Sequence, residues 1–273
     1  MNLFKLAANA LKRTFHRPLA KLGISWVVEK KLKNTWEQQK LKKHHLLGKT
    51  EVYFYDAPGF LFGLREIFVD EFYKFNASKE HLYIIDCGGY IGLSPLYFVF
   101  EHPKAKIVSF EPDKLNYELA VKNTARYRDN IEMVNKAVWI KDGHISFKQE
   151  GNMESGIVVG LEDKKNVVQV PCLRLKDYLI EPVDFLKIDI EGAEYEVLKD
   201  IAPQLHLVDN LFIEYHGKFE ESHKLLEILN ITEKAGFNFD IKEAASVHAH
   251  PFLQAKVKAA FDIQLNIFCF RKK

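Results

Sequence analysis

The stretch that decides the fold is YIIDCGGYIGLS, residues 83–94. An apolar run ends there in Asp86, and two glycines four residues apart, Gly88 and Gly92, follow at once. This order is typical of a buried strand that turns sharply into a helix, because glycine adopts the positive φ angles that a tight turn needs. Ligands of parallel α/β sheets bind beyond the carboxyl ends of the strands, so the turn predicts a ligand site.

On both sides of this turn, apolar runs of strand length alternate with segments of helical period. The sequence predicts strands at 82–86, 106–112, 131–138, 183–190 and 210–216, two closing strands at 238–244 and 263–272, and helices at 65–75, 93–102, 114–127, 191–201 and 220–236. A hairpin is expected at 141–149, where Asp142-Gly143 is a type I′ turn signal. This alternation predicts an α/β fold with a mostly parallel sheet, covered on both faces, and an antiparallel strand at one edge.

The first 50 residues differ from the rest in charge. They carry twelve Lys or Arg against two acids, a balance of +10, whereas residues 51–273 carry 27 against 35, a balance of −8. We therefore expect a basic helical N-terminal extension over 1–50 and one domain over 51–273. Apolar residues recur every four positions within 1–15, as in an amphipathic basic helix. Such a helix could pack on its own domain or on a second subunit, or residues 1–45 could contact the inner face of an anionic membrane.

The composition excludes several classes of protein. With 273 residues, 47% of them hydrophobic, the chain can bury a sizeable core. Cys87, Cys172 and Cys269 lie far apart and form no CxxC or Cys/His pattern, so neither a disulfide framework nor a zinc site is expected. No run of about 18 apolar residues and no secretory leader is visible, which predicts a cytoplasmic protein.

The glycine spacing and the acid at the strand end suit S-adenosylmethionine. The frame is Asp-x-Gly-x-x-x-Gly, whereas a dinucleotide site needs GxGxxG, and Asp86 would repel a pyrophosphate. The methionine end of the cofactor would lie over the glycine turn, and Glu111, after the second strand, would accept hydrogen bonds from the ribose hydroxyls. Asn135 and Ala137, at the end of the third strand, are expected beside the adenine. The predicted cofactor residues are Asp86, Gly88, Gly92, Glu111, Asn135, Ala137 and Asp189.

Four polar residues lie at or just after the ends of the fourth and fifth predicted strands, where an acceptor would lie: Asp189, Glu191, Glu214 and His216. Alternate residues of an extended chain point to the same side, so these side chains are expected to converge. Asp189, Glu214 and His216 could bind a divalent cation such as magnesium. Without a metal, His216 could be the base that takes the acceptor's proton, while Asp189 orients the acceptor hydroxyl or faces the sulfonium. Glu191 is also expected in the first turn of a helix, where an acid stabilises the helix dipole.

Four stretches together resemble the FkbM-type methyltransferases. They are IIDCGGYIGLS (84–94), FEPDKLNYELAVKN (110–123), VDFLKIDIEGAEYEVLKDI (183–201) and LFIEYH (211–216), of which KIDIEGAE (187–194) is the most specific part. The resemblance covers roughly residues 60–240. It implies a seven-strand Rossmann-like sheet and an S-adenosylmethionine-dependent O-methyltransferase that acts on a hydroxyl of a sugar, a glycolipid or a polyketide. The first 50 residues lie outside the resemblance.

Three other functions fit parts of the pattern. A nicotinamide oxidoreductase shares the fold but would show GxGxxG spacing. A nucleic-acid methyltransferase usually carries a motif such as Asn-Pro-Pro-Tyr after the fourth strand, where this chain has DIEG (189–192), and the acidic domain also argues against nucleic acid as a partner. A non-catalytic glycan- or membrane-binding module on a methyltransferase fold is the main alternative. The expected partner is a hydroxylated small molecule or glycan, and a homo-oligomer is a further expectation.

Overall fold

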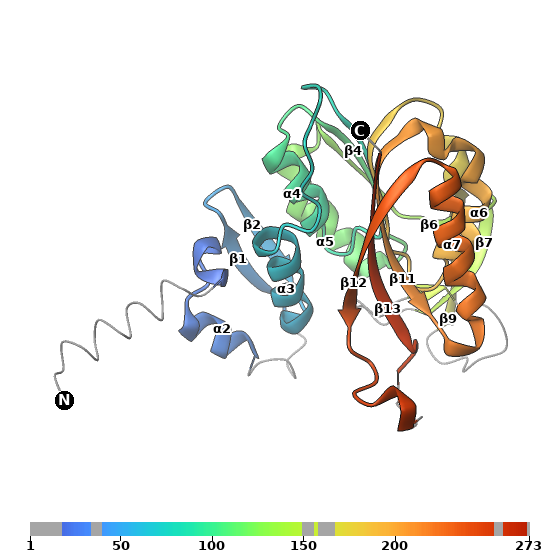
Figure 1. Ribbon diagram of the computed structural model, residues 1–273. Helices are drawn as coiled ribbons and strands as arrows, with labels where there is room; N and C mark the ends of the chain where they lie inside the picture. Colours follow the sequence, from blue (N-terminus) through green and yellow to red (C-terminus); the bar gives the residue numbers. More distant parts are fainter. Residues whose placement is uncertain (1–17, 34–39, 149–155, 158–166, 254–258, 272–273) are drawn as a thin grey trace.

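A computed structural model describes residues 18–33, 40–148, 156–157, 167–253 and 259–271 (Figure 1). Its main feature is a seven-stranded sheet with helices on both faces. The strands are β3 (Tyr83–Cys87), β4 (Lys106–Phe110), β5 (Ile131–Val134), β10 (Val183–Ile188), β11 (Val208–Gly217), β12 (Phe237–Ala245) and β13 (Ile263–Arg271). The α-helices are α2 (Trp26–Lys33), α3 (Ala57–Leu64), α4 (Leu93–Glu101), α5 (Lys114–Thr124), α6 (Glu194–Ile201) and α7 (Ser222–Lys234). Shorter turns are the π-helix η2 (Arg65–Val69) and the 3₁₀ helices η1 (Pro18–Leu22), η3 (Ala125–Tyr127), η4 (Leu175–Tyr178), η5 (Ala202–Leu207), η6 (Phe219–Glu221) and η7 (Pro251–Leu253).

The strand order is β12-β13-β11-β10-β3-β4-β5, which confirms the predicted α/β fold. The run from β11 to β5 is parallel, and β13, next to the edge strand β12, is antiparallel to both of its neighbours. The chain passes from β3 through β4 to β5 and then returns on the other side of β3 as β10. The strand order therefore reverses between β3 and β10, the position at which ligands bind in such sheets.

Neighbouring residues of the central strands are buried against different helices. Ile84 and Phe185 belong to an apolar cluster with residues of α3 and α4, whereas Ile85 and Leu186 belong to a second cluster with residues of α6 and α7. Figure 1 shows these two pairs of helices on opposite sides of the sheet. Because successive side chains of a strand point to opposite faces, one short apolar run supplies both cores.

A second, four-stranded sheet is inserted between β5 and β10. Its order is β6-β9-β7-β8, with β6 (Ala137–Trp139), β7 (Gly143–Lys148), β8 (Gly156–Ile157) and β9 (Val167–Arg174). The single strand predicted at 131–138 is wrong, because the chain turns after Val134, where its carbonyl accepts from the N–H of Lys136. The hairpin predicted at 141–149 is also wrong, because β9 lies between β6 and β7 and pairs with both. A local turn signal does not report a strand that is inserted from further along the chain.

The helix predicted at 65–75 begins before residue 65 in the structure and ends before residue 75. It starts as α3 at Ala57, with Pro58 in its first turn, and continues as the π-helix η2 to Val69. Proline is favoured at a helix start because its missing N–H needs no partner there. The helix has ended before Glu71, which has a φ of +50°.

The N-terminal region packs against the same face of the sheet as α3. Leu19 and Ile24 are buried in the apolar cluster that contains α3. The strands β1 (Lys42–Leu46) and β2 (Thr50–Phe54) form an antiparallel hairpin that crosses the boundary predicted near residue 50. The prediction of a helical extension is therefore wrong for residues 42–50. The amphipathic segment 1–15 lies outside the described residues, and no helix within the described ranges is long and apolar enough to cross a membrane.

Candidate active site

The glycine turn after β3 brings three strand ends together. The N–H groups of Gly88 and Gly89 both donate to the carbonyl oxygen of Phe110, at 3.0 and 2.9 Å. The N–H of Asp189, after β10, donates to the carbonyl oxygen of Cys87 at 3.1 Å. Gly88 has a φ of +98°, and a Cβ at this position would lie 1.9 Å from the carbonyl oxygen of Asp189. Glycine is needed here because β3 and β10 approach each other so closely.

Asp86 supports this turn from below. Its side chain is fully buried, and Oδ2 accepts hydrogen bonds from the hydroxyls of Ser94 and Ser109 at 2.8 and 2.7 Å. Oδ1 lies 3.4 Å from the ammonium of Lys187. Burial raises the pKa of Asp86, although Lys187 and the two hydroxyls act in the opposite direction. Asp86 is thus held beneath the turn and does not line the cavity beyond the strand ends.

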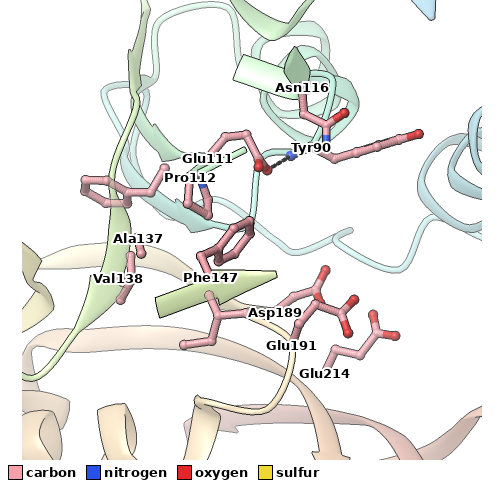
Figure 2. A pocket seen from close by; sticks show the side chains of 13 residues that line it. Tyr90, Glu111, Pro112, Asn116, Ala137, Val138, Phe147, Asp189, Glu191 and Glu214 are labelled. Atoms are coloured by element: carbon pink, nitrogen blue, oxygen red, sulfur yellow. Dashed lines mark hydrogen bonds between the residues drawn. The ribbon is translucent and has the colours of Figure 1, made fainter. Parts of the chain in front are cut away.

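A cavity opens beyond the carboxyl ends of β3, β4, β10 and β11 (Figure 2). The residues that line it are Gly88, Tyr90, Phe110, Glu111, Pro112, Asn116, Ala137, Val138, Phe147, Asp189, Ile190, Glu191 and Glu214. The predicted site residues among them are Gly88, Glu111, Ala137, Asp189, Glu191 and Glu214. The cavity therefore collects predicted cofactor residues and predicted catalytic residues in one place.

The other predicted residues lie behind this lining. Gly92 begins α4 with a φ of +87°, and a Cβ there would lie 3.1 Å from the side chain of Thr124. The amide of Asn135 donates to the carbonyl oxygens of Glu111 and Pro112, at 2.9 and 3.2 Å. Asn135 thus fixes the backbone that carries Glu111, and Gly92 lets α4 start close to its neighbour α5.

The backbone holds Glu111 at one end of the cavity. Its Oε2 accepts from the N–H of Tyr90 and its Oε1 from the N–H of Asp113, both at 2.8 Å (Figure 2). Burial raises the pKa of Glu111 to about 8, although these two amides favour the charged form. In the ionised form, which hydroxyl donors would favour, each oxygen keeps a further lone pair, so the oriented carboxylate could accept bonds from two adjacent hydroxyls.

Next to Glu111 the cavity wall is apolar. Phe110 is the last residue of β4. Pro112 follows β4, Ala137 and Val138 come from β6, and Phe147 comes from β7 (Figure 2). The inserted sheet therefore forms one wall of the cavity. An apolar slot beside an oriented carboxylate fits a nucleoside, with its base against the apolar side chains and its ribose at the acid.

Acidic side chains gather at the other end of the cavity. Asp189, Glu191 and Glu214 turn their carboxylates to the same region (Figure 2). Behind them, Nε2 of His216 lies 3.6 Å from Oε2 of Glu191 and 3.7 Å from Oε1 of Glu214. Donor atoms of Asp189, Glu214 and His216, one from each, lie within 4.8 Å of one another. The structure thus brings together the three residues predicted as metal ligands.

His216 is surrounded by carboxylates. Its Nδ1 lies 3.2 Å from Oε1 of Glu194, in addition to the two carboxylates near Nε2. Burial lowers the pKa of His216, but Glu191, Glu194 and Glu214 together raise it well above its usual value. Without a bound cation, His216 therefore carries a proton at neutral pH and is a poor general base.

Lys187 supplies a second positive charge beneath the cavity. It is buried, and its ammonium lies 2.8 Å from the carbonyl oxygen of Gly88 and 3.0 Å from the carboxylate of Asp189. Burial lowers the pKa of Lys187, but Asp189, Tyr73 and Asp86 raise it further, and the result lies well above the usual value. The ammonium of Lys187 thus lies between Asp86, beneath the turn, and Asp189, which lines the cavity.

The loop before α6 differs from the prediction. The helix begins at Glu194, so Glu191 is not in its first turn and has a φ of +54° instead. Oε1 of Glu194 accepts from the N–H groups of Ile190 and Gly192, at 3.2 and 3.0 Å. These bonds fold the loop so that Glu191 faces the cavity. A non-glycine residue in this region of φ is strained, and such strain is often found at functional sites.

The sequence gives no signal for two further residues near the acidic end. Glu66, from η2, is buried and its Oε1 lies 3.4 Å from the amide nitrogen of Asn266, from β13. Asn266 is the cross-strand partner of Glu214. Burial and then the charge of Asp189 raise the pKa of Glu66 to about 7. Glu66 therefore adds a carboxylate to the cluster. It does not lie at a strand end, so no sequence motif identifies it as a site residue.

The sequence is similar to those of known methyltransferases. The Methyltransferase FkbM domain family matches residues 86–239. Methyltransferase 1 of Beauveria bassiana (strain ARSEF 2860) is 27% identical over 192 residues, which cover 60% of this chain and 77% of that protein. Methyltransferase sdnD of Sordaria araneosa is 27% identical over 211 residues, which cover 64% of this chain and 80% of that protein.

A solved structure of a methyltransferase also aligns with part of this chain. The methyltransferase FkbM from Methylobacillus flagellatus KT aligns over 70% of this chain with 17% identity and a TM-score of 0.47, and the aligned part spans 44% of that chain. The family match covers more than half of the sequence and includes the ends of β3, β4, β10 and β11, which border the cavity. The chain belongs to the FkbM methyltransferase family.

Proposed function

We propose that this methyltransferase uses S-adenosylmethionine and transfers its methyl group to a hydroxyl oxygen of a sugar, a glycolipid or a polyketide-like acceptor. The observation that carries the proposal is a cavity with two unlike ends. One end has the backbone-held carboxylate of Glu111, and the other has the carboxylates of Asp189, Glu191 and Glu214. The cofactor has a ribose for the first end and a sulfonium and an ammonium for the second.

The lining supports one direction for the cofactor. The ribose hydroxyls would bind Glu111, and the adenine would lie against Ala137, Val138 and Phe147. The methionine end would pass over Gly88, which lines the cavity. The cationic sulfonium would then approach Asp189, because opposite charges attract strongly in a partly buried site.

Methyl transfer forms an oxygen–carbon bond while the carbon–sulfur bond breaks, and the electron pair of that bond stays on sulfur. The protein must align the acceptor oxygen with the methyl group and remove the hydroxyl proton. Glu214 lines the cavity, and burial followed by the charge of Asp189 raises its pKa well above that of an ordinary carboxyl. In its ionised form, which the approach of the cationic sulfonium would favour, Glu214 is a stronger base than an exposed carboxylate because its pKa is raised. We propose that Glu214 accepts the hydroxyl proton and that Glu191 orients the acceptor.

A divalent cation is a second way to activate the hydroxyl. Asp189, Glu214 and His216 offer two carboxylates and an imidazole as ligands. Glu194, at Nδ1 of His216, fits the carboxylate that usually orients a metal-binding histidine. A bound cation would lower the pKa of the acceptor hydroxyl.

The proposal also places the protein in the cytoplasm. Cys87, Cys172 and Cys269 are buried and free. Free thiols are usual in reducing compartments. Their burial makes them core residues and not part of the site.

Calorimetric titration tests the cofactor first. S-adenosylmethionine and S-adenosylhomocysteine should bind the purified protein and NAD should not, with and without magnesium. A folded protein that binds none of these ligands would contradict the proposal and favour a non-catalytic glycan- or membrane-binding module. Methyl-labelled cofactor with hydroxylated acceptors and their amino analogues tests the reaction. Label in the amino analogues alone would contradict O-methyl transfer.

A further inference from the structure

Helix α2 presents large apolar side chains to solvent. It lies in the N-terminal region, on the other side of the molecule from α6 and α7 (Figure 1). The exposed fractions are 47% for Trp26, 66% for Val27 and 37% for Val28. Three successive positions span about 200° of a helix, so these side chains take up about half of the circumference of α2. Phe62, on the adjoining helix α3, is 48% exposed as well.

This apolar surface rests on a folded base. Leu22 and Ile24, just before α2, are buried in the core cluster, and the carbonyl oxygen of Leu22 lies 2.8 Å from Nε2 of His44 on β1. A shallow hollow between the N-terminal region and α3 is lined by residues that include Leu19, Glu29 and Phe62. The exposed side chains are therefore held in place on the surface, and large exposed apolar patches often mark interaction sites.

Positive charge surrounds the exposed apolar side chains. Lys21, Lys30 and Lys31 are exposed, and the ammonium of Lys30 lies 5.3 Å from the ring centre of Trp26. The first 50 residues of the chain have a balance of +10, against −8 for the rest. We call Lys21, Trp26, Val27, Lys30 and Lys31, together with Val28 and Phe62, the α2 surface.

We propose that the α2 surface docks on an anionic lipid bilayer. Tryptophan prefers the boundary between head groups and acyl chains, valine gains from insertion below it, and lysine is attracted to anionic head groups. A symmetric contact between two copies of the chain would bring the lysines of both copies together, which opposes self-association through this surface. A nucleic acid would neutralise the lysines but would leave Val27 and Val28 without an apolar partner.

Docking in this way would place the cavity close to the bilayer. The hydroxyl of Tyr90, which lines the cavity, donates to Oδ2 of Asp56 at 3.4 Å, and Asp56 precedes α3. Phe62 of the α2 surface is six residues further along, or about 9 Å of helix. The proposal stands on the surface itself and does not depend on the proposed reaction.

Vesicle flotation with the full chain tests the proposal. The probes are vesicles of phosphatidylcholine alone and of phosphatidylcholine mixed with phosphatidylglycerol, each at low and high salt. We expect binding to the anionic vesicles only, weakened by salt, and reduced by about tenfold in Val27→Asp and in Lys30→Glu. Leu226→Asp is the matched control for Val27, because Leu226 is 68% exposed on α7, and Lys234→Glu is the control for Lys30. Both control variants should bind like the wild type.

Three results would overturn the proposal. The first is equal binding to neutral and anionic vesicles or none to either. The second is vesicle binding that the Val27 and Lys30 changes leave unaltered while both variants remain folded by circular dichroism. The third is a wild type that binds no vesicles but shifts RNA in a gel or forms a dimer in size-exclusion chromatography. In that case the RNA shift or the dimer would be lost in Val27→Asp. Calorimetry with S-adenosylmethionine separates this proposal from the proposed function, because Val27→Asp should leave cofactor affinity unchanged.

Discussion

The amide nitrogen of Asn266 lies 3.4 Å from a carboxylate oxygen of Glu66, across 200 positions of sequence. Asn266 stands opposite Glu214 in the pairing of β13 with β11, so the contact brings η2 to the acidic end of the cavity. The charge of Asp189 contributes to the raised pKa of Glu66, and Glu66 in turn contributes to that of Glu214. The residues that surround the proposed acceptor site thus affect one another's protonation.

Replacing Glu66 with glutamine should stabilise the protein at alkaline pH. Burial and the charge of Asp189 raise its pKa from 4.5 to about 7. The folded protein therefore binds this proton more tightly than the unfolded chain does, and stability falls as pH rises from 4.5 to about 7. In Glu66→Gln this loss is absent, so we expect its free energy of unfolding to exceed that of the wild type by about 1–3 kcal/mol at pH 8 and not at pH 4.

Chemical denaturation of the cofactor-free protein at both pH values measures this difference. Glu220→Gln is the control, because Glu220 is exposed. A gain of equal size at pH 4 and pH 8 would show that packing, and not the charge of Glu66, is responsible.

Much of the site is predictable because its residues follow strand ends. Gly88, Glu111, Asp189 and Glu214 each come at or just after the carboxyl end of a parallel strand, and parallel strands place these ends at one edge of the sheet. Glu66 lies outside this rule, since its place in the cluster depends on how α3 and η2 pack on the sheet. Packing between distant segments leaves no periodic signal in the sequence.

The inserted sheet likewise depends on pairing between distant segments, which the sequence could not predict. The Asp142-Gly143 signal correctly marks a chain reversal, with β7 beginning at Gly143, but β6 and β7 both pair with β9 and not with each other. The cavity wall at Phe147 depends on this pairing. Local turn chemistry could therefore predict neither this wall nor its contribution to the site.

Replacing Glu111 with alanine should weaken cofactor binding. The two backbone N–H bonds hold both carboxylate oxygens, and each could accept one ribose hydroxyl. A hydrogen bond to a charged group contributes about 1.5–3 kcal/mol, so loss of both ribose bonds should lower the affinity for S-adenosylmethionine by about 100-fold or more in calorimetry. Glu118→Ala, at an exposed position of α5, is the control. Unchanged affinity in a folded Glu111→Ala protein would exclude Glu111 as the ribose ligand.

A methyl group on Gly88 should damage both folding and binding. The Cβ of Gly88→Ala would meet the carbonyl oxygen of Asp189 at 1.9 Å, and the φ of +98° is unfavourable for alanine. We expect a loss of about 3 kcal/mol or more in the free energy of unfolding and a loss of cofactor binding. Gly143→Ala separates the two causes, because Gly143 also has a positive φ, +142°, but nothing lies within 4 Å of its Cβ. Similar losses in both variants would show that φ strain alone, and not the contact with β10, makes Gly88 necessary.

Removing the charge of Lys187 should destabilise the protein strongly. Its ammonium lies between Asp86 and Asp189, at 3.4 and 3.0 Å, and all but a small part of it is buried. Loss of one partner of a buried ion pair costs about 3–5 kcal/mol, because the other charge is left uncompensated. Denaturation of Lys187→Met should show a loss of this size, and the added change Asp86→Asn should recover part of it. Lys74→Met, at an exposed ion pair, is the control and should change stability by less than about 1 kcal/mol.

A divalent cation, if the site takes one, must displace the proton of His216. Burial lowers the pKa of His216, but three carboxylates raise it well above 6.5. The proton therefore stabilises the folded protein at low pH, and this stabilisation is lost as pH rises through the raised pKa. Manganese or magnesium competes with the proton for the same nitrogen, so its affinity should rise with pH.

We expect thermal shifts with either cation that grow from pH 6 to pH 9 and vanish in His216→Gln and Asp189→Asn. His248→Gln is the matched control, because His248 has its own carboxylate partner, Asp262, at 3.1 Å. If neither cation shifts the melting temperature at any pH while S-adenosylmethionine still binds, the metal is excluded and Glu214 is left as the base.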